Sequence, residues 1–201
     1  MRSFIVRALI LTLTLFNSNF IHGVNPSSYL DPLYKVGDYD QGGVIFFVTP
    51  DGNHGLVASI NDISAGAPWG LETDRVGALS NYIQFGENYT TAGKLNTQLI
   101  VDKYPSGSYA ANLCKNYSVK MNGITYNDWY LPCLKELGLM MAMQETINSI
   151  SVAHGGTAIQ KNFYWSSFEA TSTAWNQSFD NAGQEMMNKG NLYRVRAVRA
   201  F

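Results

Sequence analysis

The chain is poor in the residues from which catalytic and metal sites are commonly built. Only two of its 201 residues are cysteines and three are histidines. His22, His54 and His154 are too scattered to suggest a metal site, since zinc ligands recur at short, regular spacings. No nucleophile motif surrounds a histidine, and no glycine loop suited to phosphate occurs. The sequence therefore predicts no metal, no cofactor and no enzymatic activity.

Charge is also scarce, with charged residues at 14% of the chain and a net charge of −1. No run of five basic residues occurs, and such runs are typical of nucleic-acid binding, so we expect no nucleic-acid partner. Internal repeats, heptads and Gly-X-Y tracts are missing as well. Their absence argues against a solenoid, a coiled coil and a collagen-like stalk.

Long apolar runs are missing except at the start of the chain. Arg2 and Arg7 precede an uncharged, mainly apolar stretch over residues 8–16, and Gly23 offers a small residue at a cleavage point. This pattern predicts a secretory signal peptide over residues 1–23. The stretch is too short for a membrane span, which needs roughly 20 apolar residues. We expect a linker over residues 24–37 and a single domain over residues 38–201.

The two cysteines, Cys114 and Cys133, form an even pair in a chain expected to be exported. Export places them in an oxidising compartment, where such pairs commonly form disulfides. We predict a Cys114–Cys133 disulfide. The alternative is two buried free thiols.

Aromatic residues and glycine are abundant, with four Trp, twelve Tyr, ten Phe and 18 Gly. With low charge, this composition is typical of a β-rich extracellular domain with many turns. The local patterns predict strands over residues 43–48, 56–60, 163–167, 173–179 and 192–201. A further hairpin is expected around residues 121–124. Helices are expected from Thr90 or Thr91 to Lys103, over residues 109–116, and from Pro132 onward. Residues 61–84 and 149–161 are expected to be irregular.

The last expected strand carries an arginine on its apolar face. Side chains alternate along a strand, so Arg199 shares a face with Val195 and Ala197. A guanidinium drawn into the interior needs an anionic partner. Glu136 lies near the first turn of the helix from Pro132, where the helix dipole favours a carboxylate. We predict a structural ion pair between Glu136 and Arg199.

The opposite face of the same strand carries Arg194 and Arg196. We expect both to be solvated, with Lys189 nearby, and we predict that these three residues contact an anionic glycan. An ordinary charged outer face is the alternative. Trp165 and Trp175 are expected in the core rather than as sugar-stacking platforms.

Several short motifs occur in an order that is specific as a set. They are Gly-Gly-Val-Ile-Phe at 42–46, His-Gly-Leu-Val-Ala at 54–58, Asp-Trp-Tyr-Leu-Pro at 128–132 with Glu136 and Leu137, Tyr-Trp-Ser-Ser at 164–167, and Val-Arg-Ala-Val-Arg at 195–199. In this order they resemble the DUF1566 family, which is similar to the C-terminal domain of the Legionella collagen-like adhesin. The resemblance covers residues 38–201.

The resemblance implies an α+β domain of the C-type-lectin-like or formylglycine-generating-enzyme-like superfold, with antiparallel β-hairpins and about three helices. It further implies a bacterial protein that is secreted, periplasmic or on the cell surface, and a non-catalytic, adhesin-like function in glycan or extracellular-matrix recognition. Sulfated glycosaminoglycans are ligands of the collagen-like adhesin. The alternatives are a structural or protein-interaction module of the envelope and, more remotely, an oxidase-like enzyme using the cysteines. The oligomeric state stays open, because this chain has no collagen stalk.

Overall fold

The structure, a computed structural model, describes residues 33–84 and 90–201. The predicted signal peptide and residues 24–32 of the predicted linker lie outside the described residues. The described part of the chain is a mixed α+β fold with four helices and several antiparallel sheets. This confirms the α+β class, with one helix more than the three expected.

A four-stranded antiparallel sheet contains the first predicted hairpin. Its order is β1 (Tyr39–Asp40), β2 (Gly43–Val48), β3 (Gly55–Ala58) and β13 (Val198–Ala200). Val44 packs into one apolar cluster and its neighbour Ile45 into another, on opposite sides of β2. Both faces are therefore covered, which explains why the apolar residues of this strand do not alternate with polar ones.

A five-stranded sheet forms the second layer of strands. Its order is β11 (Gln184–Asn188), β10 (Thr173–Ser178), β9 (Phe163–Glu169), β12 (Tyr193–Val195) and β4 (Ser64–Ala67). Only the β9–β12 pair is parallel. Strand β11 was not predicted, and β4 lies in a segment expected to be irregular. Two small hairpins complete the strands: β5 (Ile83–Gln84) with β6 (Thr90–Thr91), and β7 (Val119–Met121) with β8 (Ile124–Tyr126).

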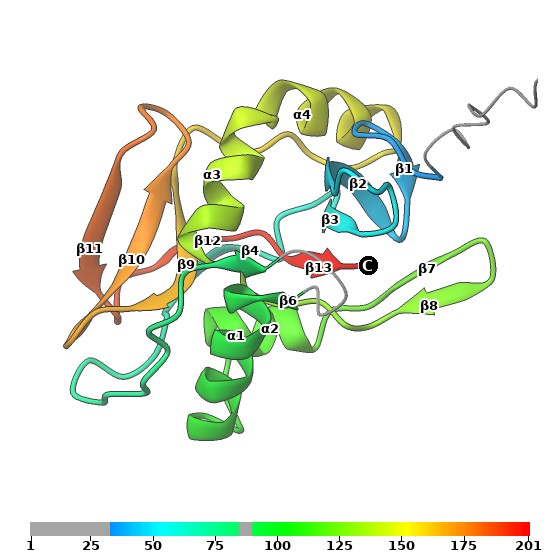
Figure 1. The fold of residues 1–201 in the computed structure, drawn as a ribbon. Coiled ribbons are helices and arrows are strands. Elements are labelled where there is room, and N and C mark those ends of the chain that lie inside the picture. Colours follow the sequence, from blue (N-terminus) through cyan, green and yellow to red (C-terminus); the bar gives the residue numbers. More distant parts are fainter. Residues whose placement is uncertain (1–32, 85–89) are drawn as a thin grey trace, which may run out of the picture. The chain divides into compact units, whose positions relative to one another are not determined.

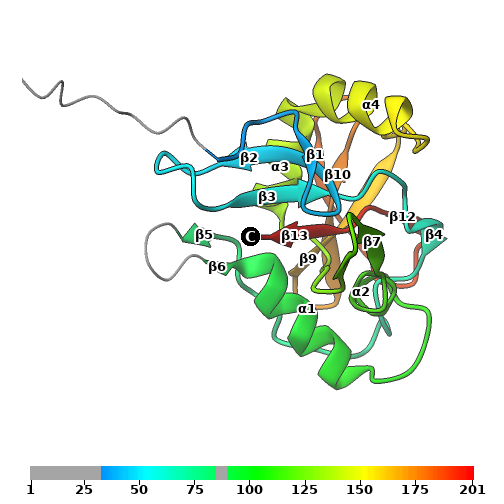
Figure 2. The same ribbon diagram turned by 90° about the vertical axis from the view of Figure 1, so that its right-hand side faces the viewer.

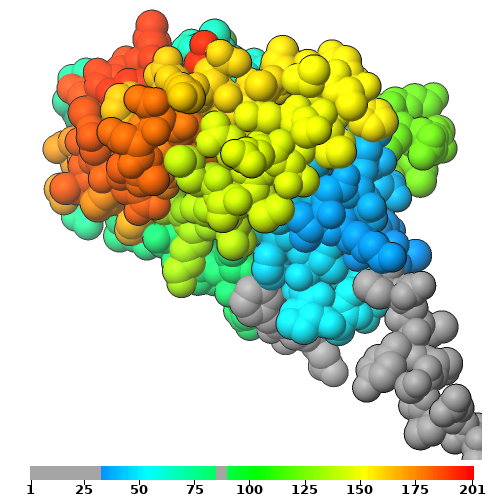
Figure 3. All heavy atoms as spheres, turned by 90° about the horizontal axis from the view of Figure 1, so that it is seen from above, coloured from blue at the N-terminus to red at the C-terminus, as the bar shows by residue number. Residues whose placement is uncertain are grey.

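The helices lie on two sides of the strands. Helices α1 (Ala92–Lys103) and α2 (Ala110–Lys115) pack together on one side, and α3 (Leu134–Ala142) and α4 (Gln144–Ala153) lie on the other (Figure 1). Helix α3 contacts β2 as well as β9 and β10, so it joins the two large sheets. Viewed from the α3 and α4 side, these helices cover the surface between the first hairpin and the β10–β11 pair (Figure 3). The helix expected from Pro132 starts two residues later and is interrupted at Met143.

The prediction of one continuous closing strand is wrong. The chain leaves the five-stranded sheet after β12 and enters the four-stranded sheet at β13. Between the two strands, Arg196 and Ala197 cross from one sheet to the other, and both are at most 1% exposed. The alternation of faces assumed for a single strand therefore breaks at this crossing.

The inward face of α1 carries polar side chains as well as the buried Ile100. Leu95 and Leu99 are 45% and 43% exposed. Asn96 and Thr97 are buried instead. The Thr97 hydroxyl accepts a hydrogen bond from the Leu131 backbone N–H at 2.9 Å. Tertiary hydrogen bonds thus act together with the burial of Ile100 to set which side of α1 faces inward.

Candidate functional site

Lys189, predicted as a solvated glycan contact, is buried. Its Nζ lies 2.6 Å from Glu169 Oε1 and 5.0 Å from the centroid of the Trp69 ring, and it also donates to the Asp74 backbone carbonyl. Both charged side chains of the pair are 0% exposed. The expectation of a solvated lysine is wrong, because Lys189 directly follows β11 and lies beneath the loop that follows Trp69, where Glu169 neutralises it.

Arg196 is likewise buried, with a side chain that is 0% exposed. Its guanidinium donates to Asp62 Oδ1 at 3.2 Å, to the Thr157 carbonyl at 3.1 Å and to Ser151 Oγ at 3.1 Å. Burial lowers the pKa of Arg196, and the Asp62 carboxylate opposes that shift. The prediction that Arg196 is solvated is wrong, since this residue stands at the crossing between the two sheets.

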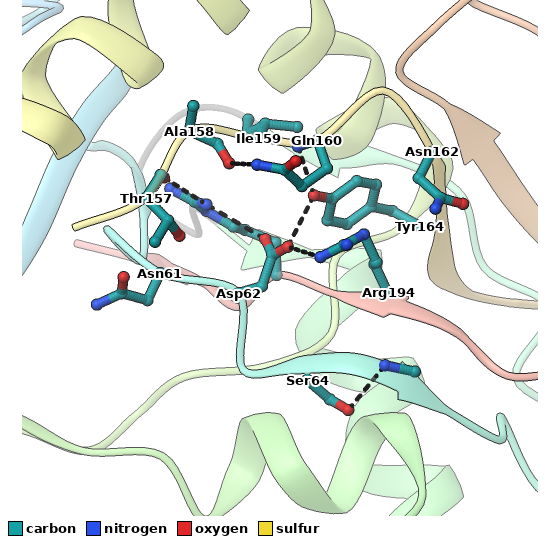
Figure 4. A network of polar contacts seen from close by, with 12 residues as sticks. Asn61, Asp62, Ser64, Thr157, Ala158, Ile159, Gln160, Asn162, Tyr164 and Arg194 are labelled. Carbon is teal, nitrogen blue, oxygen red and sulfur yellow. Dashed lines mark hydrogen bonds and ion pairs between the residues drawn. The ribbon is translucent and has the colours of Figure 1, made fainter.

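Arg194 shares the Asp62 carboxylate with Arg196. The close view shows Arg194 and Tyr164 directed at Asp62 (Figure 4). Arg194 Nη1 lies 2.9 Å from Asp62 Oδ2, which also accepts a hydrogen bond from the Tyr164 hydroxyl at 2.9 Å. The Arg194 side chain is 24% exposed. The cluster therefore ties the segment after β3 to β9 and β12. It leaves Arg194 as the only partly exposed member of the predicted glycan-binding set.

Arg199 is drawn inward as expected, but the predicted pairing with Glu136 is wrong. Arg199 Nε lies 2.6 Å from Asp128 Oδ1, and its Nη2 lies 3.1 Å from Asp128 Oδ2. The reason is the local pairing of the backbone, because Tyr130 bridges Val198 in β13 and brings the preceding residues beside Arg199.

Glu136 is buried without a cation. It accepts hydrogen bonds from the Tyr130 hydroxyl and the Cys133 backbone N–H, both at 2.7 Å. Its carboxylate lies at the first turn of α3 and against Gly93 in the first turn of α1, where helix dipoles favour negative charge. Burial nevertheless raises the pKa of Glu136. This carboxylate therefore joins the starts of two helices.

The predicted disulfide is wrong, because Cys114 and Cys133 are free thiols. Cys114 packs inward from α2, whereas Cys133 stands at the start of α3, so the two side chains serve separate packing positions. Burial raises the pKa of both thiols. Of the alternatives considered from the sequence, the structure has the two buried thiols.

A cavity of about 510 Å³ lies where α1, the end of α2, the end of β13 and the segment before α3 meet. The end of β13 and the first turns of α1 lie side by side in Figure 2. The lining residues are His54, Thr90, Thr91, Lys94, Leu95, Thr97, Gln98, Lys115, Asp128, Trp129, Tyr130, Ala200 and Phe201. None of the three cations predicted to bind a glycan belongs to this lining.

The cavity has a closed inner wall and an accessible rim. The inner wall consists of Thr91, Thr97, Trp129 and Tyr130, each at most 2% exposed. Lys94, Gln98 and Lys115 are exposed at the rim. A bound molecule would thus contact mainly the rim side chains, because the inner-wall hydroxyls of Thr91 and Thr97 are buried and already hydrogen-bonded within the protein.

The described side chains of the rim include two lysines and one aspartate. The aspartate, Asp128, is paired with Arg199. Lys94 and Lys115 make no hydrogen bond or ion pair with any residue that the structure describes. Two ammonium groups near one cavity attract an anion, and unpaired lysines keep their donors for it.

The sequence offered a clue to only part of this site. Asp128 belongs to the 128–132 motif, but Lys94 and Lys115 belong to no motif and come from different helices. Their approach depends on the packing of α1 against α2, which is long-range information. Among residues 33–84 and 90–201, no group of three or more His, Cys, Asp or Glu side chains could hold a metal ion. In the same residues, no helix combines the length and apolarity needed to cross a membrane.

Comparison with models of known protein families finds no match for this chain. A search of curated proteins finds no match either.

Proposed function

We propose that this chain is an exported, non-catalytic binding domain that recognises an acidic glycan in the cavity beside α1. The observation that carries the proposal is that Lys94 and Lys115, at the rim of the cavity, have no ion-pair partner among residues 33–84 and 90–201. Asp128, the acidic side chain among the described lining residues, is already paired with Arg199. The rim therefore favours an anionic ligand.

The size and lining of the cavity support a saccharide. Its volume of about 510 Å³ lies within the range typical of small-molecule sites. Leu95 and Phe201 offer apolar surface to the C–H groups of a sugar ring, while Thr90 and Gln98 offer hydrogen-bonding groups to its hydroxyls. A lysine binds a carboxylate or sulfate as a point charge, without demanding one geometry.

The motif resemblance supports the same proposal. A domain of the DUF1566 family with a C-type-lectin-like superfold would be a bacterial protein acting in the periplasm, at the cell surface or in the medium. The α+β architecture, with its two large sheets and flanking helices, is compatible with that assignment. Fold analogy alone does not define a ligand, so the lysine-lined cavity carries the functional argument.

A glycan array tests this proposal. Residues 24–201 are applied as wild type, as the Lys94→Ala/Lys115→Ala double variant and as Lys161→Ala, which removes an exposed lysine outside the cavity. We expect wild type and Lys161→Ala to bind uronate-containing or sulfated glycans. The double variant should lose at least about tenfold in affinity, since hydrogen bonds to charged groups are worth about 1.5–3 kcal/mol. Equal binding by all three proteins would refute the assignment.

A protein-interaction module is the second candidate, and α1 supplies its observation. Leu95 and Leu99 are exposed on neighbouring turns of this helix, next to the cavity. Exposed apolar residues that adjoin one another can mark a contact with another protein. If the chain is a protein-interaction module, we expect no binding to any glycan on the array. We also expect wild type to self-associate in sedimentation velocity, and the Leu95→Ser/Leu99→Ser double variant to stay monomeric. A monomeric wild type that binds acidic glycans would reject it.

A further inference from the structure

The Asp128 carboxylate is held rigidly from one side and open on the other. Arg199 contacts both of its oxygens, Nε to Oδ1 at 2.6 Å and Nη2 to Oδ2 at 3.1 Å. The Asp128 side chain remains 39% exposed and lines the cavity, whereas the Arg199 side chain is only 10% exposed. The arginine is thus the buried member of the pair, and Asp128 is the member that lines the cavity.

Arg199 is itself fixed by groups outside the cavity. Its Nη1 donates to the Gln41 carbonyl at 3.1 Å and to Gln41 Oε1 at 2.9 Å. Its guanidinium also lies 4.7 Å from the centroid of the Tyr126 ring. Because the contacts with Gln41 and Tyr126 fix the planar guanidinium, its two hydrogen bonds to Asp128 also fix the orientation of that carboxylate.

This arrangement leaves acceptor sites directed at the cavity. An ionised carboxylate offers about four lone-pair positions, and the two contacts with Arg199 use one on each oxygen. Neither Lys94 nor Lys115 forms an ion pair with Asp128. Because Arg199 balances its charge, Asp128 can accept hydrogen bonds from a ligand without strongly repelling a nearby anionic group.

We propose that Asp128 selects for ligand hydroxyl groups and that Arg199 is the residue that positions it. The inference rests on the proposed function and narrows it to an anion that also carries hydroxyl donors. In this arrangement the acidic group of a saccharide lies near Lys94 and Lys115, and a ring hydroxyl donates to Asp128. An anion of the same size without hydroxyls leaves the carboxylate without a donor, which costs affinity.

Two monoanions with six-membered rings separate charge recognition from hydroxyl recognition. Methyl glucuronide has a carboxylate and ring hydroxyls, whereas cyclohexanecarboxylate has the carboxylate alone. Both are titrated by NMR into residues 24–201 as wild type, Asp128→Asn, Arg199→Lys and Asp180→Asn. The last variant is the matched control, because Asp180 is exposed and outside the cavity.

We expect wild type and Asp180→Asn to bind methyl glucuronide with about tenfold higher affinity than cyclohexanecarboxylate. This ratio corresponds to the cost of leaving one buried polar group without a hydrogen-bond partner. In Asp128→Asn, the amide oxygen turns to Arg199 and the cavity receives a donor instead of an acceptor. The preference should fall to about twofold or less, and binding of cyclohexanecarboxylate should stay the same or tighten, because a negative charge has been removed. Arg199→Lys keeps the positive charge but loses the paired hydrogen bonds to the two oxygens of Asp128. It should therefore also weaken the preference for methyl glucuronide over cyclohexanecarboxylate.

The outcomes distinguish the inference from the function on which it rests. Binding of both anions by wild type, with no preference between them, overturns the role of Asp128 and leaves the acidic-ligand site standing. An equal loss of affinity for both ligands in Asp128→Asn also overturns it, because that result describes structural damage. Failure of wild type to bind either anion overturns both proposals.

Discussion

Replacing Asp62 by Asn should destabilise the fold severely without affecting ligand binding. Asp62 is the carboxylate that neutralises Arg196, whose side chain is 0% exposed. It also accepts hydrogen bonds from Arg194 and Tyr164. Asn keeps the shape of the side chain but removes the charge, so the guanidinium of Arg196 is left buried without a counterion.

The expected cost is about 3–5 kcal/mol, the range for breaking one partner of a buried ion pair. That is a large fraction of the stability of a domain, which is typically about 5–15 kcal/mol. The free energy of unfolding is measured by urea titration, with tryptophan fluorescence as the probe. Asp180→Asn serves as the control, since an exposed aspartate should change stability by no more than about 0.5 kcal/mol.

A loss below about 1 kcal/mol for Asp62→Asn would refute the reasoning, because it would place Arg196 in a solvated environment. It would also reopen the prediction that Arg194 and Arg196 face a ligand. Binding of an acidic glycan by the folded fraction of Asp62→Asn should equal that of wild type, since Asp62 does not line the cavity.

Two further predictions concern the starts of α1 and α3. Gly93→Ala should destabilise the protein in thermal unfolding, because the new Cβ would meet Glu136 Oε2 at 2.2 Å and the Tyr130 ring at 2.8 Å. The control is Gly138→Ala, whose Cβ would lie in open space and which should stabilise the helix by up to about 1 kcal/mol. Equal effects of the two substitutions would contradict the close packing at Gly93. Burial raises the folded-state pKa of Glu136 above 4.5, and the groups that face it, Tyr130 and Cys133, are uncharged in this range. The folded state therefore binds the proton of Glu136 more tightly than the unfolded state does. As pH rises from about 4.5 through the folded-state pKa of Glu136, the free energy of unfolding of wild type should fall relative to that of Glu136→Gln, as measured by urea titrations at several pH values. A difference between the two proteins that does not change with pH would contradict the raised pKa.

Local patterns predicted the elements that are held by neighbours in sequence. The β2–β3 hairpin follows from two β-branched runs around a turn cluster. Helix α1 begins at Ala92, directly after Thr91, although the Thr91 hydroxyl donates to Tyr130 instead of capping the helix. The Asn122-Gly123 pair forms the turn between β7 and β8 with positive φ at both residues. Each of these features depends on chain geometry within a few residues.

Features that depend on distant segments were missed. Arg199 was correctly expected inside, but its partner follows from the bridge between Tyr130 and Val198, which the sequence does not reveal. The polar inner face of α1 depends on Leu131 meeting Thr97. The same limit applies to the candidate site, where packing of α1 against α2 brings Lys94 and Lys115 to one rim.

Amide chemical-shift mapping locates the ligand site, which we propose to be the cavity beside α1. Methyl glucuronide is added to ¹⁵N-labelled residues 24–201, and the shifted amides are assigned. We predict saturable shifts at Lys94, Lys115, Asp128 and the end of β13, with none around Asp62. Shifts that centre on Arg194, or no saturable shift at the cavity, would contradict the claim.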